Sequence, residues 1–154
     1  MRALVQRIGH AKVFVEGKLE GSAGHGLLLF LGVGTGDDEV SAEQLADKVL
    51  NLRIFEDEAG KMNRSVLDIS GDMLIISQFT LYADTSRGRR PSFTGACEPA
   101  KAEALYDYFV DRLRRTGLSV ATGSFGKMMQ VELINDGPVT IMIDTDQSGM
   151  KRKQ

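Results

Sequence analysis

A run of four apolar residues at 73–76, Met-Leu-Ile-Ile, stands directly before the polar segment Ser-Gln-Phe-Thr at 77–80. Apolar and β-branched residues in so short a run predict a buried strand. A strand end holds side chains more rigidly than a loop does, and a catalytic or binding site requires that rigidity. Ser77 and Thr80 would equally suit an ordinary strand in which both hydroxyls bond to nearby backbone. The segment therefore predicts a site at a strand end only if another part of the chain supports it.

The rest of the sequence alternates predicted strands with two predicted helices. Residues 26–33 are almost all leucine-like, which predicts a central strand buried on both faces. Apolar residues at helical spacing predict one helix from about residue 38 to 53 and a second from about 99 to 115. Ser41 and Gln44 form a candidate capping box for the first of them. Further strands are expected at 3–8, 12–15, 66–69, 119–122, 128–134 and 139–144.

This order of elements predicts an α/β domain in which two helices pack on a mostly antiparallel sheet or small barrel. The pattern alone does not choose between an open sheet and a closed barrel. A chain of 154 residues is long enough for one domain with a substantial core. We therefore expect a single domain over residues 1–144, followed by a flexible charged tail over 145–154.

The apolar residues and the cysteine content favour a cytoplasmic protein. No apolar run approaches the roughly 20 residues that span a bilayer, so no membrane association is expected. Arg2 and Arg7 fall inside the first strand pattern, which is unlike a signal peptide. Cys97 is the single cysteine and has no partner for an intrachain disulfide, which fits a reducing compartment. Its sequence context is not that of a nucleophile, so we expect a packing or surface role.

Several reaction classes are disfavoured by what the sequence lacks. His10 and His25 are the only histidines, and neither stands in metal-ligand spacing with Cys97 or with a carboxylate cluster. No metal site and no zinc hydrolase is therefore expected. The G-x-S-x-G turn of α/β-hydrolases is absent. The glycines at 32, 34 and 36 lack the lysine of a phosphate-binding loop and predict a turn. No cofactor is expected.

A second motif supports the segment at 77–81. Residues 135–140 are Asn-Asp-Gly-Pro-Val-Thr. Together with the Arg-Arg-Pro-Ser-Phe run at 89–93, the Gly-Lys-Met-Asn turn at 60–63 and the opening residues 1–15, these motifs resemble the D-aminoacyl-tRNA deacylase family. The resemblance covers the chain from residue 1 to about 144. It implies a small barrel-like β core with two outer helices, working as a homodimer without a cofactor.

The resemblance also implies an activity, which is hydrolysis of the ester bond of mischarged D-aminoacyl-tRNA and of glycyl-tRNA. The partner would be the aminoacylated 3′ end of tRNA, and the biological role would be chiral proofreading in translation. Ser77, Gln78, Phe79 and Thr80 become the catalytic segment, in which the N–H groups of Phe79 and Thr80 would stabilise the developing oxyanion. The Thr80 hydroxyl is either a nucleophile or a hydrogen-bonding partner. We favour the second role, because no base near Thr80 is visible in the sequence.

The missing base is tolerable for this substrate. An aminoacyl ester is already activated, and the neighbouring ribose 2′-hydroxyl can help to activate water. The chain carries a net charge of −2, with local basic clusters such as residues 87–90 and 151–153. That balance predicts a small RNA footprint, such as one end of a tRNA, rather than a long groove.

Gly137 and Pro138 have two interpretations. A proline within a strand cannot donate to the ladder, so the pair would mark an edge, a bulge or a bend. The resemblance instead implies a cis peptide, contributed by the partner subunit, whose two carbonyls accept hydrogen bonds from the α-ammonium of a D-residue. An L-residue would have to place its side chain against rigid backbone, so selection would act by exclusion. Two competing functions stay open, a hydrolase of another small ester and a non-catalytic binding module with a Gly-Pro turn at its interface.

Overall fold

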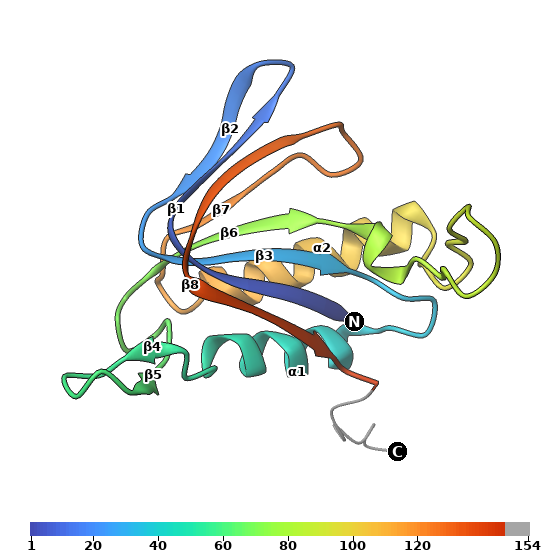
Figure 1. The fold of residues 1–154 in the computed structure, drawn as a ribbon. Coiled ribbons are helices and arrows are strands. Elements are labelled where there is room, and N and C mark those ends of the chain that lie inside the picture. The colour runs from blue at the N-terminus through green and yellow to red at the C-terminus, as the bar shows by residue number, and fades with distance from the viewer. Residues whose placement is uncertain (147–154) are drawn as a thin grey trace.

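Strand β1 (Arg2–Val15) is the axis of the fold, because three other strands pair with it. The computed structural model describes residues 1–146, and in it β1 pairs antiparallel with β2 (Lys18–Ala23), β3 (Gly26–Gly32) and β8 (Gln130–Asp144). β1 and β8 are long and bend as they cross the sheet, which curls it toward a barrel (Figure 1).

The other half of the sheet is parallel. β3 pairs with β6 (Asp72–Ser77), and β6 pairs in turn with β7 (Val120–Thr122). Two helices, α1 (Glu39–Leu50) and α2 (Pro99–Arg114), cover the outside of the sheet (Figure 1). The predicted fold class is confirmed: an α/β fold with a nearly closed, barrel-like sheet and two outer helices. The sheet is mixed, and its antiparallel pairings surround β1.

β3 separates two apolar cores, because its residues alternate between the two faces of the sheet. Leu27, Leu29 and Leu31 pack toward the helices, whereas Leu28 packs toward the inside of the curled sheet. β6 alternates in the same way, with Ile75 on the helix side and the next residue on the inner side. Every one of these leucines is at most 1% exposed. The prediction that residues 26–33 form a strand buried on both faces is therefore confirmed.

Both helices begin at side chains that cap them. Asp38 precedes α1, and its carboxylate accepts a hydrogen bond from the backbone N–H of Ser41 at 2.9 Å. The capping box expected between Ser41 and Gln44 is therefore wrong, since the aspartate three residues earlier takes that role. Glu98 caps α2 in the same manner, and Pro99 occupies the first helical position.

Three local predictions differ from the structure. Residues 3–15 form one continuous strand, because irregular pairing near Ile8 absorbs the expected break at Gly9 and His10. The last two expected strands are likewise one, β8. Residues 66–69 form a turn in which the N–H of Ile69 bonds to the carbonyl of Ser65 at 3.2 Å. A short hairpin of β4 (Phe55–Glu56) and β5 (Met62–Arg64) flanks that turn.

The start of the chain meets the end of β8. The amino group of Met1 donates to the Oγ1 of Thr145 at 2.5 Å, and the backbone N–H of Thr145 donates to the carbonyl of Met1 at 3.0 Å. Apart from residues 145 and 146, the expected charged tail lies outside the described residues. Within residues 1–146, no helix is long and apolar enough to cross a membrane.

Candidate active site

The motif at 77–80 lies where β6 ends and the chain turns. Ser77 is the last residue of β6, and the N–H of Gln78 still bonds to the carbonyl of Leu31 in the neighbouring strand at 2.8 Å. The chain then leaves the sheet and forms a short 3₁₀ helix, η1 (Phe79–Tyr82). The motif is therefore at a strand end as expected, but its second half belongs to a helical turn that the sequence pattern did not predict.

This turn forms one wall of a pocket with a volume of about 580 Å³. The second wall comes from the segment leading into α2, and the third comes from the turn between β7 and β8. The lining residues are Ile76, Ser77, Gln78, Phe79, Thr80, Ala96, Cys97, Pro99, Ala102, Phe125, Gly126, Lys127, Met128, Met129 and Val131. The structure thus brings together all four residues that the sequence predicted for the catalytic segment.

The pocket offers hydrogen-bonding groups but no carboxylate and no imidazole among its described lining residues. The side-chain amide of Gln78 donates a hydrogen bond to the Oγ1 of Thr80. The N–H groups of Phe79 and Thr80 open the helical turn, where backbone donors have no partner within the helix. Neither donates to an acceptor within residues 1–146. Such a site can stabilise negative charge on a reacting oxygen, but it has no obvious base.

The 3₁₀ helix is fixed in place by its last residue, Tyr82. The Tyr82 hydroxyl donates to Oδ2 of Asp37 at 3.2 Å, and the guanidinium carbon of Arg2 lies 4.4 Å from the centre of the Tyr82 ring. Arg2 also donates to the carbonyl of Leu81 at 2.9 Å. Burial and the Asp37 carboxylate raise the pKa of Tyr82, so its hydroxyl stays protonated and remains a donor. A Cβ on Gly34 would lie 2.7 Å from the ring, so the close contact requires glycine there.

Gly137 and Pro138 do not line this pocket, although they are the other half of the predicted site. They are joined by a cis peptide bond and are exposed, within β8. They lie opposite Arg7, which pairs with Leu27 near the start of β3, whereas Ser77 pairs with Leu31 near the end of β3. Four residues of strand span about 13 Å. Within one chain, the two halves of the predicted site are therefore at opposite ends of β3.

Side chains on both sides hold the Gly137-Pro138 turn. Asn135 bridges it, because its Oδ1 accepts from the N–H of Val139 at 2.8 Å and its Nδ2 donates to Oγ1 of Thr140 at 3.0 Å. Arg7, which is 7% exposed, donates to the carbonyl of Asp136 at 2.8 Å. A smaller cavity of about 240 Å³ lies beside this turn, between Arg7, Asp136 and the side chains of His25, Phe55 and Glu56.

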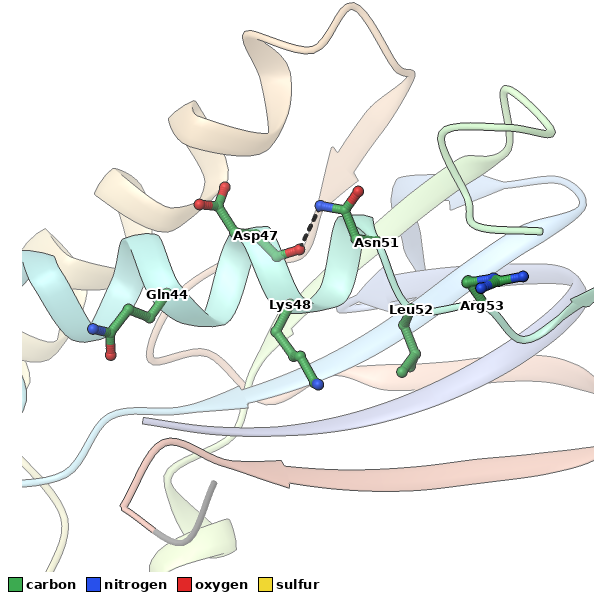
Figure 2. A pocket seen from close by; sticks show the side chains of 6 residues that line it. All are labelled: Gln44, Asp47, Lys48, Asn51, Leu52 and Arg53. Carbon is green, nitrogen blue, oxygen red and sulfur yellow. Dashed lines mark hydrogen bonds between the residues drawn. The ribbon is translucent and has the colours of Figure 1, made fainter. Parts of the chain in front are cut away.

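A further hollow of about 520 Å³ lies at the end of α1, and Figure 2 shows its lining residues. They are Gln44, Asp47, Lys48, Asn51, Leu52 and Arg53. The side chains of Lys48 and Leu52 extend to one side of the chain and those of Asp47 and Asn51 to the other, and the side-chain amide of Asn51 donates to the carbonyl of Asp47 at 2.8 Å (Figure 2). None of the predicted site residues is present, so the pocket beside Thr80 is the candidate active site.

Comparison with known proteins shows the family of the chain. Residues 4–144 match the family described as D-Tyr-tRNA(Tyr) deacylase. The chain belongs to this family. A D-aminoacyl-tRNA deacylase of Thermotoga petrophila is 59% identical over 145 residues, which cover 94% of this chain and 97% of the relative. A D-aminoacyl-tRNA deacylase of Roseiflexus sp. is 57% identical and covers 94% of both chains. The resemblance seen in the sequence is confirmed.

Two solved structures share the fold. One, described as a c-Myc DNA Unwinding Element Binding Protein, is 40% identical and has a TM-score of 0.88, covering 94% of this chain and 98% of its own. The other, described as a probable eukaryotic D-amino acid tRNA deacylase, has a TM-score of 0.81, covering 92% and 97%. Its identity of 19% makes it evidence for the fold alone.

Sequence reasoning missed the two walls of the pocket that come from later in the chain. Phe125 to Met129 lie in the turn before β8, and Ala102 lies on α2. Cys97, which was expected to have a packing or surface role, is half-buried and lines the same pocket. No local pattern marks these residues, because only the parallel pairing of β6 with β7 brings the third wall to the end of β6.

Proposed function

We propose that this protein hydrolyses the ester bond of D-aminoacyl-tRNA, releasing the D-amino acid and free tRNA, and so acts in chiral proofreading of translation. The observation that carries the proposal is the pocket, which Phe79 and Thr80 line with N–H groups that have no acceptor within residues 1–146, and whose described lining residues include no carboxylate and no imidazole. Such a pocket suits an ester that is already activated and needs only charge stabilisation and positioning. The family to which the chain belongs supports the choice of ester.

The reaction begins when water adds to the ester carbonyl carbon. The carbonyl oxygen becomes negative and accepts hydrogen bonds from the N–H groups of Phe79 and Thr80. The neighbouring ribose 2′-hydroxyl helps to activate the water. Collapse of the intermediate breaks the bond to the ribose oxygen, which takes up a proton. Thr80 acts as a hydrogen-bonding partner rather than a nucleophile, because its Oγ1 accepts from Gln78 and the described lining of the pocket has no carboxylate or imidazole to remove its proton.

The chiral filter in this proposal is the Gly137-Pro138 turn of a second subunit. The exposed turn lies too far from its own pocket along β3 to serve it, so a homodimer with sites shared between subunits would bring them together. Two features support a second copy. β8 pairs with β1 along one edge, and within residues 1–146 no strand pairs with its other edge. Ile134 and Met142 on β8 are also 55% and 50% exposed.

The same filter predicts the range of substrates. A fixed backbone turn excludes the side chain of an L-residue without reading the side chain of a D-residue. Glycine has no side chain to exclude, so glycyl-tRNA should also be hydrolysed. Aminoacylated tRNA is a cytoplasmic substrate, and we place the protein there for that reason.

A deacylation assay with D-tyrosyl-, L-tyrosyl- and glycyl-tRNA tests the proposal. We expect hydrolysis of the D-tyrosyl and glycyl esters and little hydrolysis of the L-tyrosyl ester. Equal rates on the D- and L-esters would favour a hydrolase without a chiral filter. Stable binding of tRNA with no hydrolysis of any ester would favour a non-catalytic module.

A further inference from the structure

The loop that leads away from the 3₁₀ helix carries a concentration of positive charge. Residues 85–97 contain Arg87, Arg89 and Arg90 and no acidic residue, in a chain whose net charge is −2. We call residues 85–91 the arginine loop. Its base is closed by two backbone hydrogen bonds between Asp84 and Ser92, at 2.8 and 2.9 Å. The loop is therefore a closed hairpin-like projection rather than a loose crossing.

The three guanidinium groups are available to a ligand. All three arginines are exposed, and within residues 1–146 none of them forms a salt bridge. The nearest acidic residue in the chain, Asp84, accepts a hydrogen bond from the N–H of Ser86 at 2.9 Å, and the side chain and the backbone N–H of Ser86 together lower the pKa of Asp84. Its carboxylate thus stabilises the turn at the base of the loop and leaves the arginines unneutralised.

The arginine loop is attached to the rim of the candidate active site. Phe93 follows the loop directly, and its ring packs edge-on against the ring of Phe79 with 5.0 Å between the centres. The chain then continues through Ala96 and Cys97, which line the pocket. Figure 1 shows the loop projecting beyond the end of β6, on the same side as η1. Three peptide units place the Cα of Arg90 within about 11 Å of the Cα of Phe93.

We propose that the arginine loop binds the phosphate backbone of the RNA strand whose terminal aminoacyl ester occupies the pocket. A guanidinium group can donate two parallel hydrogen bonds to two oxygens of one phosphate, and this geometry makes arginine well suited to binding phosphate. Successive phosphates of a stacked strand rise by about 3.4 Å, so a reach of about 11 Å corresponds to roughly three nucleotides. The loop therefore meets the single strand just before the terminal nucleotide. This inference rests on the proposed function and adds the place where the RNA is held.

A charge-removing variant tests the inference with two substrates. The variant is Arg87→Gln, Arg89→Gln, Arg90→Gln, and the matched control is Lys18→Gln, Lys48→Gln, Lys61→Gln. The control removes the same charge from exposed residues that do not line the pocket. Each protein is assayed on D-tyrosyl-tRNA, which carries the RNA backbone, and on the D-tyrosyl ester of adenosine, which carries no phosphate.

Near 0.15 M salt, we expect kcat/KM on D-tyrosyl-tRNA to be at least tenfold lower for the arginine-loop variant than for the wild type, because the KM of the variant is higher. In a plot of log kcat/KM against log salt concentration, each single-strand phosphate contact contributes about 0.7 to the steepness of the slope. Loss of three contacts should therefore reduce the steepness by about 2. When salt rises from 50 to 200 mM, the fold decrease in kcat/KM on D-tyrosyl-tRNA should therefore be about 15 times larger for the wild type than for the variant. On the adenosine ester the variant should match the wild type, and the control should match it on both substrates.

The outcomes separate this inference from the proposed function. An unchanged KM and salt slope for tRNA would overturn the inference and would favour another anionic ligand, such as an acidic protein segment. An equal loss on both substrates would also overturn it, because the loop would then only support the pocket. If the wild type hydrolyses neither D-ester, the proposed function itself fails, whatever the variants do.

Discussion

Two turns of the molecule present backbone groups to solvent, and an arginine of β1 holds each of them. Arg2 donates to the carbonyl of Leu81 in the 3₁₀ helix beside the pocket. Arg7 donates to the carbonyl of Asp136 in the turn that carries Gly137 and Pro138, and also to the carbonyl of Ile54 at 2.7 Å. The two turns are thus fixed from one strand, at opposite ends of β3.

The turns differ in what they face. The 3₁₀ helix lines a pocket of about 580 Å³ in its own chain, whereas the Gly137-Pro138 turn is exposed and lies beside a cavity of about 240 Å³. Yet a buried arginine and a bridging asparagine hold the exposed turn in a defined shape. Backbone groups that must discriminate between stereoisomers need such rigidity. The difference fits the proposed site, in which the first turn supplies the oxyanion donors and the second serves the pocket of another subunit.

The largest effect should come from removing one N–H group of the first turn. Phe79 is the first residue of η1, where proline is favoured, and it follows Gln78, whose φ of −145° and ψ of 84° lie outside the helical region that a following proline disfavours. Phe79→Pro should lower kcat by about 10²- to 10³-fold relative to Phe79→Ala, which loses the ring but keeps the N–H. Single-turnover deacylation of D-tyrosyl-tRNA measures the difference. Equal rates for the two variants would show that the N–H group of Phe79 has no part in catalysis.

The second turn should be almost as sensitive, although it lies outside the pocket of its own chain. Asn135→Ala removes the bridge across Gly137 and Pro138, and a displacement of about 1 Å can cost about 10²-fold in rate. The ratio of D- to L-tyrosyl-tRNA hydrolysis should fall as well. Thr140→Val is the milder control, because it removes one hydrogen bond of that bridge and should change the rate only a few-fold. A folded Asn135→Ala protein with normal rates would make the turn merely structural.

A smaller loss is expected when the support of the first turn is weakened. Tyr82→Leu removes the ring beneath Arg2 and the bond to Asp37, and should lower kcat about tenfold with a smaller change in KM. Tyr82→Phe keeps the ring and loses only the 3.2 Å hydrogen bond, so it should retain at least half the activity. If both variants lose activity equally, the hydroxyl rather than the ring positions the helix.

The smallest effect is expected at Thr80, although it stands at the centre of the motif. Thr80→Val loses the hydrogen bond from Gln78 but keeps the backbone N–H, so deacylation should fall only several-fold. Mass spectrometry of the wild type after rapid quenching should show no acyl group on Thr80. Trapping such a group would establish a covalent mechanism in place of water attack.

The sequence allowed the architecture to be predicted better than the details of the site. The leucine run of β3 and the helical spacing of α1 and α2 are strong local patterns, and all three elements were found. The 3₁₀ helix after Ser77 was missed, because Phe-Thr-Leu-Tyr continues a strand-like composition and the turn depends on tertiary contacts of Tyr82. Arg7 looked like an ordinary strand residue, since its role depends on a turn 129 residues away.

Heterodimers of two inactive variants test the central claim most directly. Phe79→Pro disables the pocket and Asn135→Ala disables the turn, so a dimer with one subunit of each has one fully intact site if sites are shared. The subunits are coexpressed with different tags at the C-terminus, because the amino group of Met1 is buried. Purified heterodimers should regain about half of the wild-type rate on D-tyrosyl-tRNA, since one of the two symmetric sites is restored. Heterodimers no more active than the two parent variants, or an active wild-type monomer, would contradict a site shared between subunits.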